Sequence, residues 1–108
     1  MEAQVLSFQN AAVMMSATFE VKASDGSIVW KSKCLGGRKK ASCNLSTDVS
    51  KTLTEKTQLI IIVLPTQTAG KEYNFYQRNY LYYVKNNHES KFVLEGMNSA
   101  WDLVVSQE

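Results

Sequence analysis

Hydrophobic and polar residues alternate with a period of two along most of the chain, the pattern of strands buried on one face. The clearest case is residues 13–21, whose apolar face is formed by Val13, Met15, Ala17, Phe19 and Val21. The dipeptide Asp25-Gly26 follows and is typical of a hairpin turn, after which the alternation resumes over residues 28–34. We therefore predict a β-hairpin over residues 12–35.

Further strands are predicted by shorter segments. A strand is expected around residues 41–45, and the continuous apolar, β-branched run 59–64 predicts a central strand covered on both faces, which ends at Pro65. Turn-forming residues separate four more short strands, around residues 73–76, 80–85, 91–95 and 101–105. The polar segment 46–57 is expected to be a loop or a single short helical turn.

Eight or nine short strands and no segment with the pattern of a full helix indicate an all-β protein. We predict a single antiparallel β-sandwich, and a closed barrel is the alternative. The length of 108 residues and the 44% hydrophobic content suit one domain, residues 1–108, with a real core.

The net charge and the terminal segments exclude few classes of function. Twelve basic and ten acidic residues give a net charge of +2, which does not favour nucleic acid as a partner. We see no transmembrane run and no signal peptide, so a soluble protein is expected. A secreted protein whose signal had been removed would look the same, so the compartment stays open.

Residues suited to catalysis are sparse. Cys34 and Cys43 could form one disulfide or remain free thiols, and they are too few for a cysteine-based metal site. The single histidine, His88, lies in a polar, turn-like run. With no phosphate loop, no serine elbow and no metal-ligand spacing, we expect a protein that is not an enzyme and has no cofactor or metal.

A basic loop is the first candidate for binding. Five of the twelve basic residues lie within residues 31–40, where Arg38, Lys39 and Lys40 follow two glycines and no acidic residue intervenes. Such a patch is suited to an anionic surface, for example lipid headgroups. The alternative is a solvated loop whose lysines prevent edge-to-edge aggregation.

An aromatic block is the second candidate. Six of the eleven aromatic residues lie within residues 73–83, and five of the six are tyrosines, Tyr73, Tyr76, Tyr80, Tyr82 and Tyr83. Alternation places Tyr80 and Tyr82 on one face of a strand and Tyr83 on the other, so some of these rings are expected in the core. The others could form a surface site that binds headgroups or sugars.

Two segments resemble actinoporins, the small cytolysins of sea anemones. The apolar strand, proline and aromatic block of that family are similar to the segment TQLIIIVLPTQTAGKEYNFYQRNYLYYVK. Their closing turn and strand are similar to GMNSAWDLVVS, and the two segments together cover about half of the chain. The resemblance implies a β-sandwich that binds phosphocholine headgroups, with Pro65, Tyr73 and Tyr76 at the matching positions. Counterparts of the pore-forming N-terminal segment and of the tyrosine-bearing helix are missing, so it implies surface binding rather than a pore. Fungal lectins of similar architecture add carbohydrate as a ligand.

Three hypotheses follow from these features. The first is a module that binds lipid headgroups at a membrane surface, with cytolysin-like or toxin activity as its extension. The second is a lectin-like module that binds glycans, and the third is a protein-interaction domain or homo-oligomer with the tyrosines at its interface.

Overall fold

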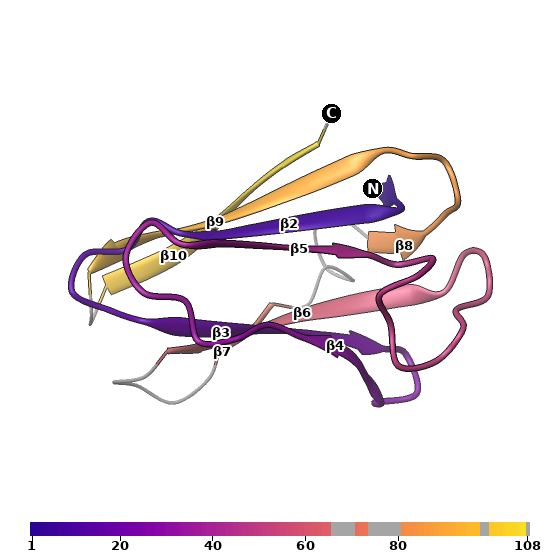
Figure 1. Cartoon of the computed structure of the whole chain (residues 1–108), viewed down its shortest axis with the longest axis horizontal. Coiled ribbons are helices and arrows are strands. Elements are labelled where there is room, and N and C mark those ends of the chain that lie inside the picture. The colour runs from indigo at the N-terminus through magenta and orange to yellow at the C-terminus, as the bar shows by residue number, and fades with distance from the viewer. Residues whose placement is uncertain (66–70, 74–80, 98–99, 108) are drawn as a thin grey trace.

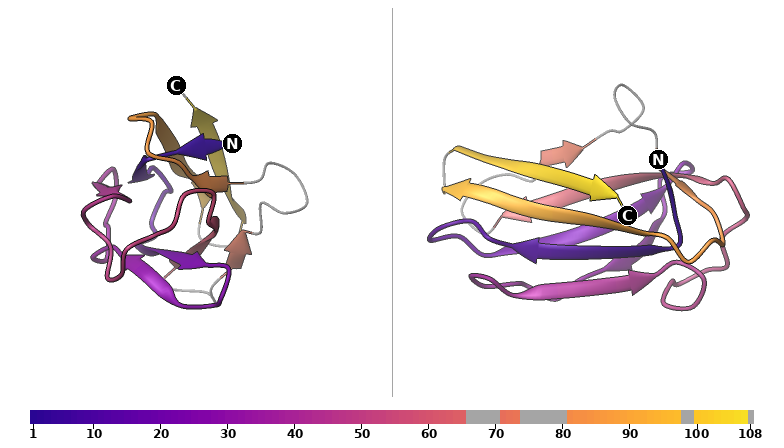
Figure 2. Two further views of the ribbon diagram at one scale, coloured as in Figure 1. Left: turned by 90° about the vertical axis from the view of Figure 1, so that its right-hand side faces the viewer. Right: turned by 90° about the horizontal axis from the view of Figure 1, so that it is seen from above.

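The chain folds into two β-sheets that pack face to face (Figures 1 and 2). The computed structural model describes residues 1–65, 71–73, 81–97 and 100–107. The regular elements in these residues are all strands: β1 (Glu2–Ala3), β2 (Val5–Asn10), β3 (Ala17–Ala23), β4 (Ile28–Lys31), β5 (Lys40–Asn44), β6 (Gln58–Pro65), β7 (Lys71–Tyr73), β8 (Leu81–Tyr83), β9 (Glu89–Met97) and β10 (Ala100–Gln107).

The two sheets confirm the predicted all-β sandwich. Sheet A has the strand order β1-β8-β6-β3-β4, with β7 also paired to β6, and sheet B has the order β10-β9-β2-β5. The prediction of a purely antiparallel sandwich is wrong in one respect, because β1 pairs with β8 and β2 pairs with β9 in parallel. Strands joined by short hairpins must be antiparallel, whereas the chain between β2 and β9 runs through β3, β4, β6, β7 and β8 of sheet A and through β5 of sheet B.

The centre of the core is aromatic and joins the two sheets. Phe8 of sheet B stacks on Phe19 of sheet A, with 5.0 Å between ring centroids, and also lies 5.2 Å from Trp30 and from Phe92. Phe8, Phe19 and Phe92 are completely or almost completely buried. Stacked rings of this kind add stabilisation beyond that of their buried area.

The predicted hairpin exists, but it is shorter than expected. The Asp25 carboxylate accepts hydrogen bonds from the backbone and side chain of Ser27 at the turn, at 2.9 and 2.6 Å. The first strand starts at Ala17 rather than near residue 12. Met14 has a left-handed backbone (φ 58°) that ends the extended run, so Val13 is exposed instead of sharing the core face with Phe19.

The central strand was predicted correctly. β6 pairs with β3 over residues 59–65 on one side and with β7 and β8 on the other. Ile61 and Val63 are buried on the inner face, and Ile62 on the opposite face is buried as well. Segment 46–57 is a loop that contributes Leu53 to the core. The prediction omits β2, whose Leu6 and Phe8 alternate with polar residues in the expected way.

Candidate functional site

Among the predicted site residues whose side chains the structure describes, Pro65, Tyr82 and Tyr83 do not form one surface site. Pro65 is buried at the end of β6, whereas Tyr82 pairs with Gln58 at its beginning, seven positions away along the strand and therefore roughly 23 Å distant. Tyr83 is buried, and its hydroxyl lies 2.7 Å from Ser46 Oγ. Tyr82 is half-buried, Tyr73 lies in β7 opposite Ile61, and Tyr76 and Tyr80 lie outside the described residues.

The two cysteines are free thiols in the structure, so the disulfide alternative is not realised. Cys34 is exposed after β4, and Cys43 is buried in β5. Burial, with a smaller contribution from the charge of Asp48, raises the pKa of the Cys43 thiol to about 12. A thiol with such a pKa stays protonated and has no role as a nucleophile near neutral pH.

The basic residues of the predicted patch are all exposed. Arg38 and Lys39 precede β5, and Lys40 is its first residue. The backbone N–H of Arg38 donates to the carbonyl oxygen of Asn10 at 2.6 Å, and the N–H of Asn10 donates to that of Lys39 at 3.0 Å. The basic loop is therefore held directly against the last residue of β2.

Asn10 also organises the segment that follows β2. Its buried side-chain amide donates to the carbonyl oxygens of Met15 and Leu35, at 2.7 and 2.8 Å, and accepts from the N–H of Ala12 at 3.0 Å. One residue thus joins the loop 11–16 to the loop 32–39. Both connections lie at the same end of the sandwich, on the left of Figure 1.

Exposed apolar side chains stand at this end. Ala12 and Met15 are buried and anchor the loop, while Val13 and Met14 between them are 54% and 80% exposed. Met97 at the end of β9 is 59% exposed. Val13 forms an isolated parallel β-bridge with Met97, in which the Val13 N–H donates a 2.8 Å hydrogen bond to the Gly96 carbonyl oxygen. We call the surface formed by these apolar residues and the neighbouring cations the tip, which consists of Val13, Met14, Met97, Arg38 and Lys39.

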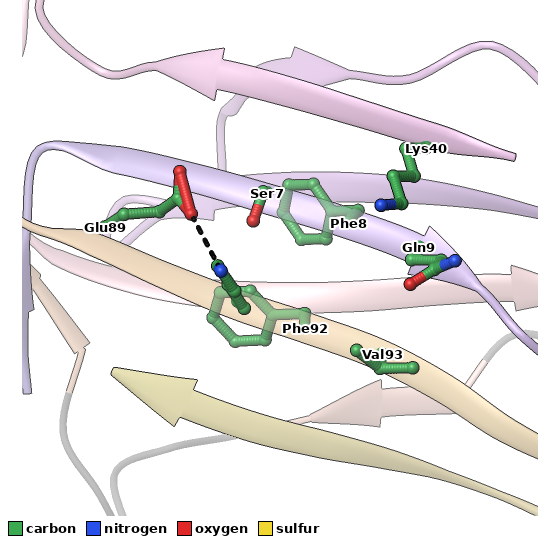
Figure 3. A pocket seen from close by; sticks show the side chains of 8 residues that line it. Ser7, Phe8, Gln9, Lys40, Glu89, Phe92 and Val93 are labelled. Carbon is green, nitrogen blue, oxygen red and sulfur yellow. Dashed lines mark ion pairs between the residues drawn. The ribbon is translucent and has the colours of Figure 1, made fainter. Parts of the chain in front are cut away.

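A shallow hollow of about 360 Å³ lies on the outer face of sheet B (Figure 3). Register places Ser7 beside Lys91, and Gln9 beside Lys40 and Val93, so these side chains line one patch. Lys91 pairs with Glu89 at 3.8 Å. The hollow therefore offers hydroxyl, amide, ammonium and carboxylate groups close together, which suits a polar ligand.

The prediction from sequence missed the apolar half of the tip, although a signal exists. Residues 11–15 read AAVMM, five apolar residues in a row. Because a half-buried strand buries only alternate residues, an uninterrupted apolar run beside polar strands must expose some of them or leave the strand. Ser7 and Gln9 of the hollow carry no comparable signal, because polar residues on the outer face of a strand are ordinary.

No protein-family model matches this chain, and no curated protein matches it significantly. Within the described residues, no helix has the length and hydrophobicity needed to span a bilayer. The described histidine, cysteine and carboxylate side chains form no group of three that could hold a metal ion.

Proposed function

We propose that this protein is a non-enzymatic module that binds membrane surfaces through the tip. The observation that carries the proposal is that three exposed apolar side chains lie at the same end of the sandwich as the exposed Arg38 and Lys39, whose backbones are held there by hydrogen bonds to the backbone of Asn10. Apolar side chains of this size enter the boundary between headgroups and acyl chains. The cations beside them are attracted to anionic headgroups.

The expected affinity is modest. Burial of the exposed parts of Val13, Met14 and Met97 contributes roughly 3 to 4 kcal/mol. Each of Arg38 and Lys39 adds up to about 1 kcal/mol at an anionic surface. A sum of roughly 5 to 6 kcal/mol corresponds to an association constant on the order of 10⁴ M⁻¹, so binding is reversible and needs both components.

The proposal places lipid contact at the tip rather than at the tyrosines. Pro65 and Tyr83 are buried, so these two residues are not available to a headgroup. The resemblance to cytolysins supports a membrane as the target. Lytic activity would require a further step beyond binding. Release of a trapped dye from vesicles would measure it.

The test is co-sedimentation with vesicles of phosphatidylcholine alone and of phosphatidylcholine with phosphatidylserine, at two salt concentrations. Wild-type protein should bind the anionic vesicles, and the bound fraction should fall as salt screens the cations. Met14→Asp should weaken binding about tenfold or more, because it removes apolar contact and adds repulsion. Arg38→Glu should abolish most of the preference for phosphatidylserine.

Matched controls come from the opposite end of the sandwich. Ile28 is 45% exposed beside the Asp25 turn, and Lys85 is exposed after β8. Ile28→Asp and Lys85→Glu should bind as wild type does. The proposal is overturned if the wild type binds neither kind of vesicle. It is also overturned if substitutions at the tip and at the opposite end of the sandwich reduce vesicle binding equally.

Carbohydrate binding is the second candidate, favoured by the hollow on sheet B. Hydroxyl, amide and charged groups from Ser7, Gln9 and Glu89 match the donors and acceptors of a sugar. Isothermal titration with mono- and disaccharides should then give heat that Gln9→Leu removes. Because Gln9 is not part of the tip, the same variant should still bind vesicles.

A further inference from the structure

The strands at the sheet edges differ in how well they are protected. Edge strands expose unpaired backbone groups, and proteins guard them with short length, lysine, proline or bulges. In the described part of the chain, β1, β7, β4 and β5 contain two, three, four and five residues. β4 ends at Lys31 and β5 begins with Lys40, so these edges also carry positive charge.

β10 lacks these safeguards. It has eight residues, and among the described strands it pairs only with β9. The register runs without a bulge from Ala100 opposite Met97 to Gln107 opposite Ser90. Asp102 is its single charged residue, and Val104 is 46% exposed on the outer face. Figure 2 (right) shows this strand at the margin of sheet B.

We infer that β10 pairs in antiparallel fashion with β10 of a second copy of this chain, so that two sheets B join into one. With the two-fold axis at Val104, the two Val104 side chains lie side by side at the centre of the outer face. On either side of them, Asp102 of one copy lies opposite Ser106 of the other. Apolar contact at the centre is thus flanked by polar residues.

Charge makes this arrangement self-complementary. Within one chain, Ser106 of β10 lies opposite Lys91 of β9. Lys91 and Asp102 of the second copy would therefore lie on either side of the small Ser106, two strand spacings or roughly 10 Å apart at their Cα atoms. A lysine side chain can span much of that gap. The two-fold axis creates the contact twice.

The pairing has a consequence that rests on the proposed function. β10 starts at the end of the sandwich where β9 finishes at Met97 of the tip. In an antiparallel pair, the two copies place these ends on opposite sides. The dimer would therefore present two tips that face away from each other, a geometry suited to bridging two membranes.

Analytical ultracentrifugation without lipid tests the dimer by itself. The wild type should approach twice the mass of the 12.2 kDa chain as its concentration rises through the micromolar range. Val104→Lys should raise the dimer dissociation constant at least tenfold. Ser42→Lys, on the outer face of β5 at the other edge of the sheet, should leave it unchanged.

Charge reversal tests the register. Asp102→Lys and Lys91→Glu should each weaken the dimer, and the double variant should recover most of the loss, because opposite charges then face each other again. Folding of each variant is checked by circular dichroism. A monomer at every concentration, or equal dissociation constants for Val104→Lys and the wild type, would overturn the inference.

Vesicle clustering separates this inference from the proposed function. The wild type should bind and cluster anionic vesicles, whereas Val104→Lys should bind without clustering. A dimer that binds no vesicle would contradict the proposed function and leave the β10 interface intact. Clustering by a variant that is monomeric in the centrifuge would contradict the bridging geometry.

Discussion

The side-chain amide of Asn10 donates a 2.7 Å hydrogen bond to the carbonyl oxygen of Met15, and through this bond a buried residue shapes the exposed tip. The same amide also donates to the carbonyl oxygen of Leu35 at 2.8 Å. A fully buried asparagine with three side-chain hydrogen bonds therefore occupies a position that alternation would give to an apolar residue. Its side-chain hydrogen bonds replace the regular backbone hydrogen bonds between strands at the point where two loops leave the sheets.

Asn10→Ala should destabilise the fold by about 2 to 5 kcal/mol, because the Met15 carbonyl oxygen and the Ala12 N–H lose the hydrogen bonds of this side chain and the Leu35 carbonyl oxygen keeps only the one from the Ala17 N–H. Urea unfolding followed by tryptophan fluorescence measures the loss. Gln9→Ala, one residue earlier and half-buried on the outer face, should change stability by less than about 1 kcal/mol. Equal losses for the two variants would contradict the role assigned to Asn10.

Phe8→Ala should be among the most damaging substitutions in the core, at about 3 to 5 kcal/mol. The ring contacts Phe19, Trp30 and Phe92 across both sheets, so its removal opens a cavity between them. Phe8→Leu should cost less because it keeps part of the volume. Ile28→Ala, at an exposed position, is the control and should lie within about 0.5 kcal/mol of the wild type.

The two cysteines should differ in reactivity. In the native protein at pH 8, a thiol reagent such as dithionitrobenzoate should label the exposed Cys34 quickly and the buried Cys43 only through unfolding. In denaturant, both thiols should react. Rapid reaction of two thiols per native chain would show that Cys43 is accessible.

The raised pKa of Cys43 also predicts a loss of stability at high pH. The unfolded thiol, with a pKa near 9.0, ionises above that pH, while the folded thiol keeps its proton up to about pH 12. Since the unfolded state then binds fewer protons, stability falls between these values by about 1.4 kcal/mol per pH unit. Between pH 8 and pH 10, the unfolding free energy of the wild type should therefore fall by roughly 1.4 kcal/mol more than that of Cys43→Ala, because the unfolded thiol is only half ionised at pH 9.0. Parallel pH profiles would contradict the assignment.

Tyr83→Phe should cost about 1 kcal/mol, since it removes the 2.7 Å hydrogen bond to Ser46 Oγ and keeps the ring in the core. A double-mutant cycle with Ser46→Ala should return a coupling energy of roughly 0.5 to 1.5 kcal/mol. The single variant should bind vesicles as the wild type does. If a fully folded Tyr83→Phe variant lost vesicle binding, Tyr83 would belong to a ligand-binding site after all.

Local pattern was enough for much of the fold. The alternation of Phe19 and Val21, the Asp25-Gly26 turn and the apolar run of β6 predicted a hairpin and a central strand, and both are present. The alternation over residues 13–15 misled the prediction. There, the positive φ of Met14 and the hydrogen bond from Asn10 to Met15 override the period of two.

The candidate site was only partly accessible from sequence. The cluster at residues 38–40 was visible as a charge run, and all three of its side chains are exposed. Its apolar neighbours could not be assigned, because Met97 is 83 positions away from Met14 in the chain and reaches the tip only through the pairing of Val13 with β9. The same difficulty affects the hollow, whose lining comes from β2, β5 and β9.

The all-β class, the main hairpin and the central strand follow from local sequence patterns, because the stereochemistry of the backbone makes side chains alternate between faces within a few residues. The folded structure was needed to show that β2 pairs in parallel with β9, that Tyr83 is buried, and that a basic loop and an apolar loop meet at Asn10. Those outcomes depend on contacts between residues far apart in the chain, and no local period encodes which strands become neighbours.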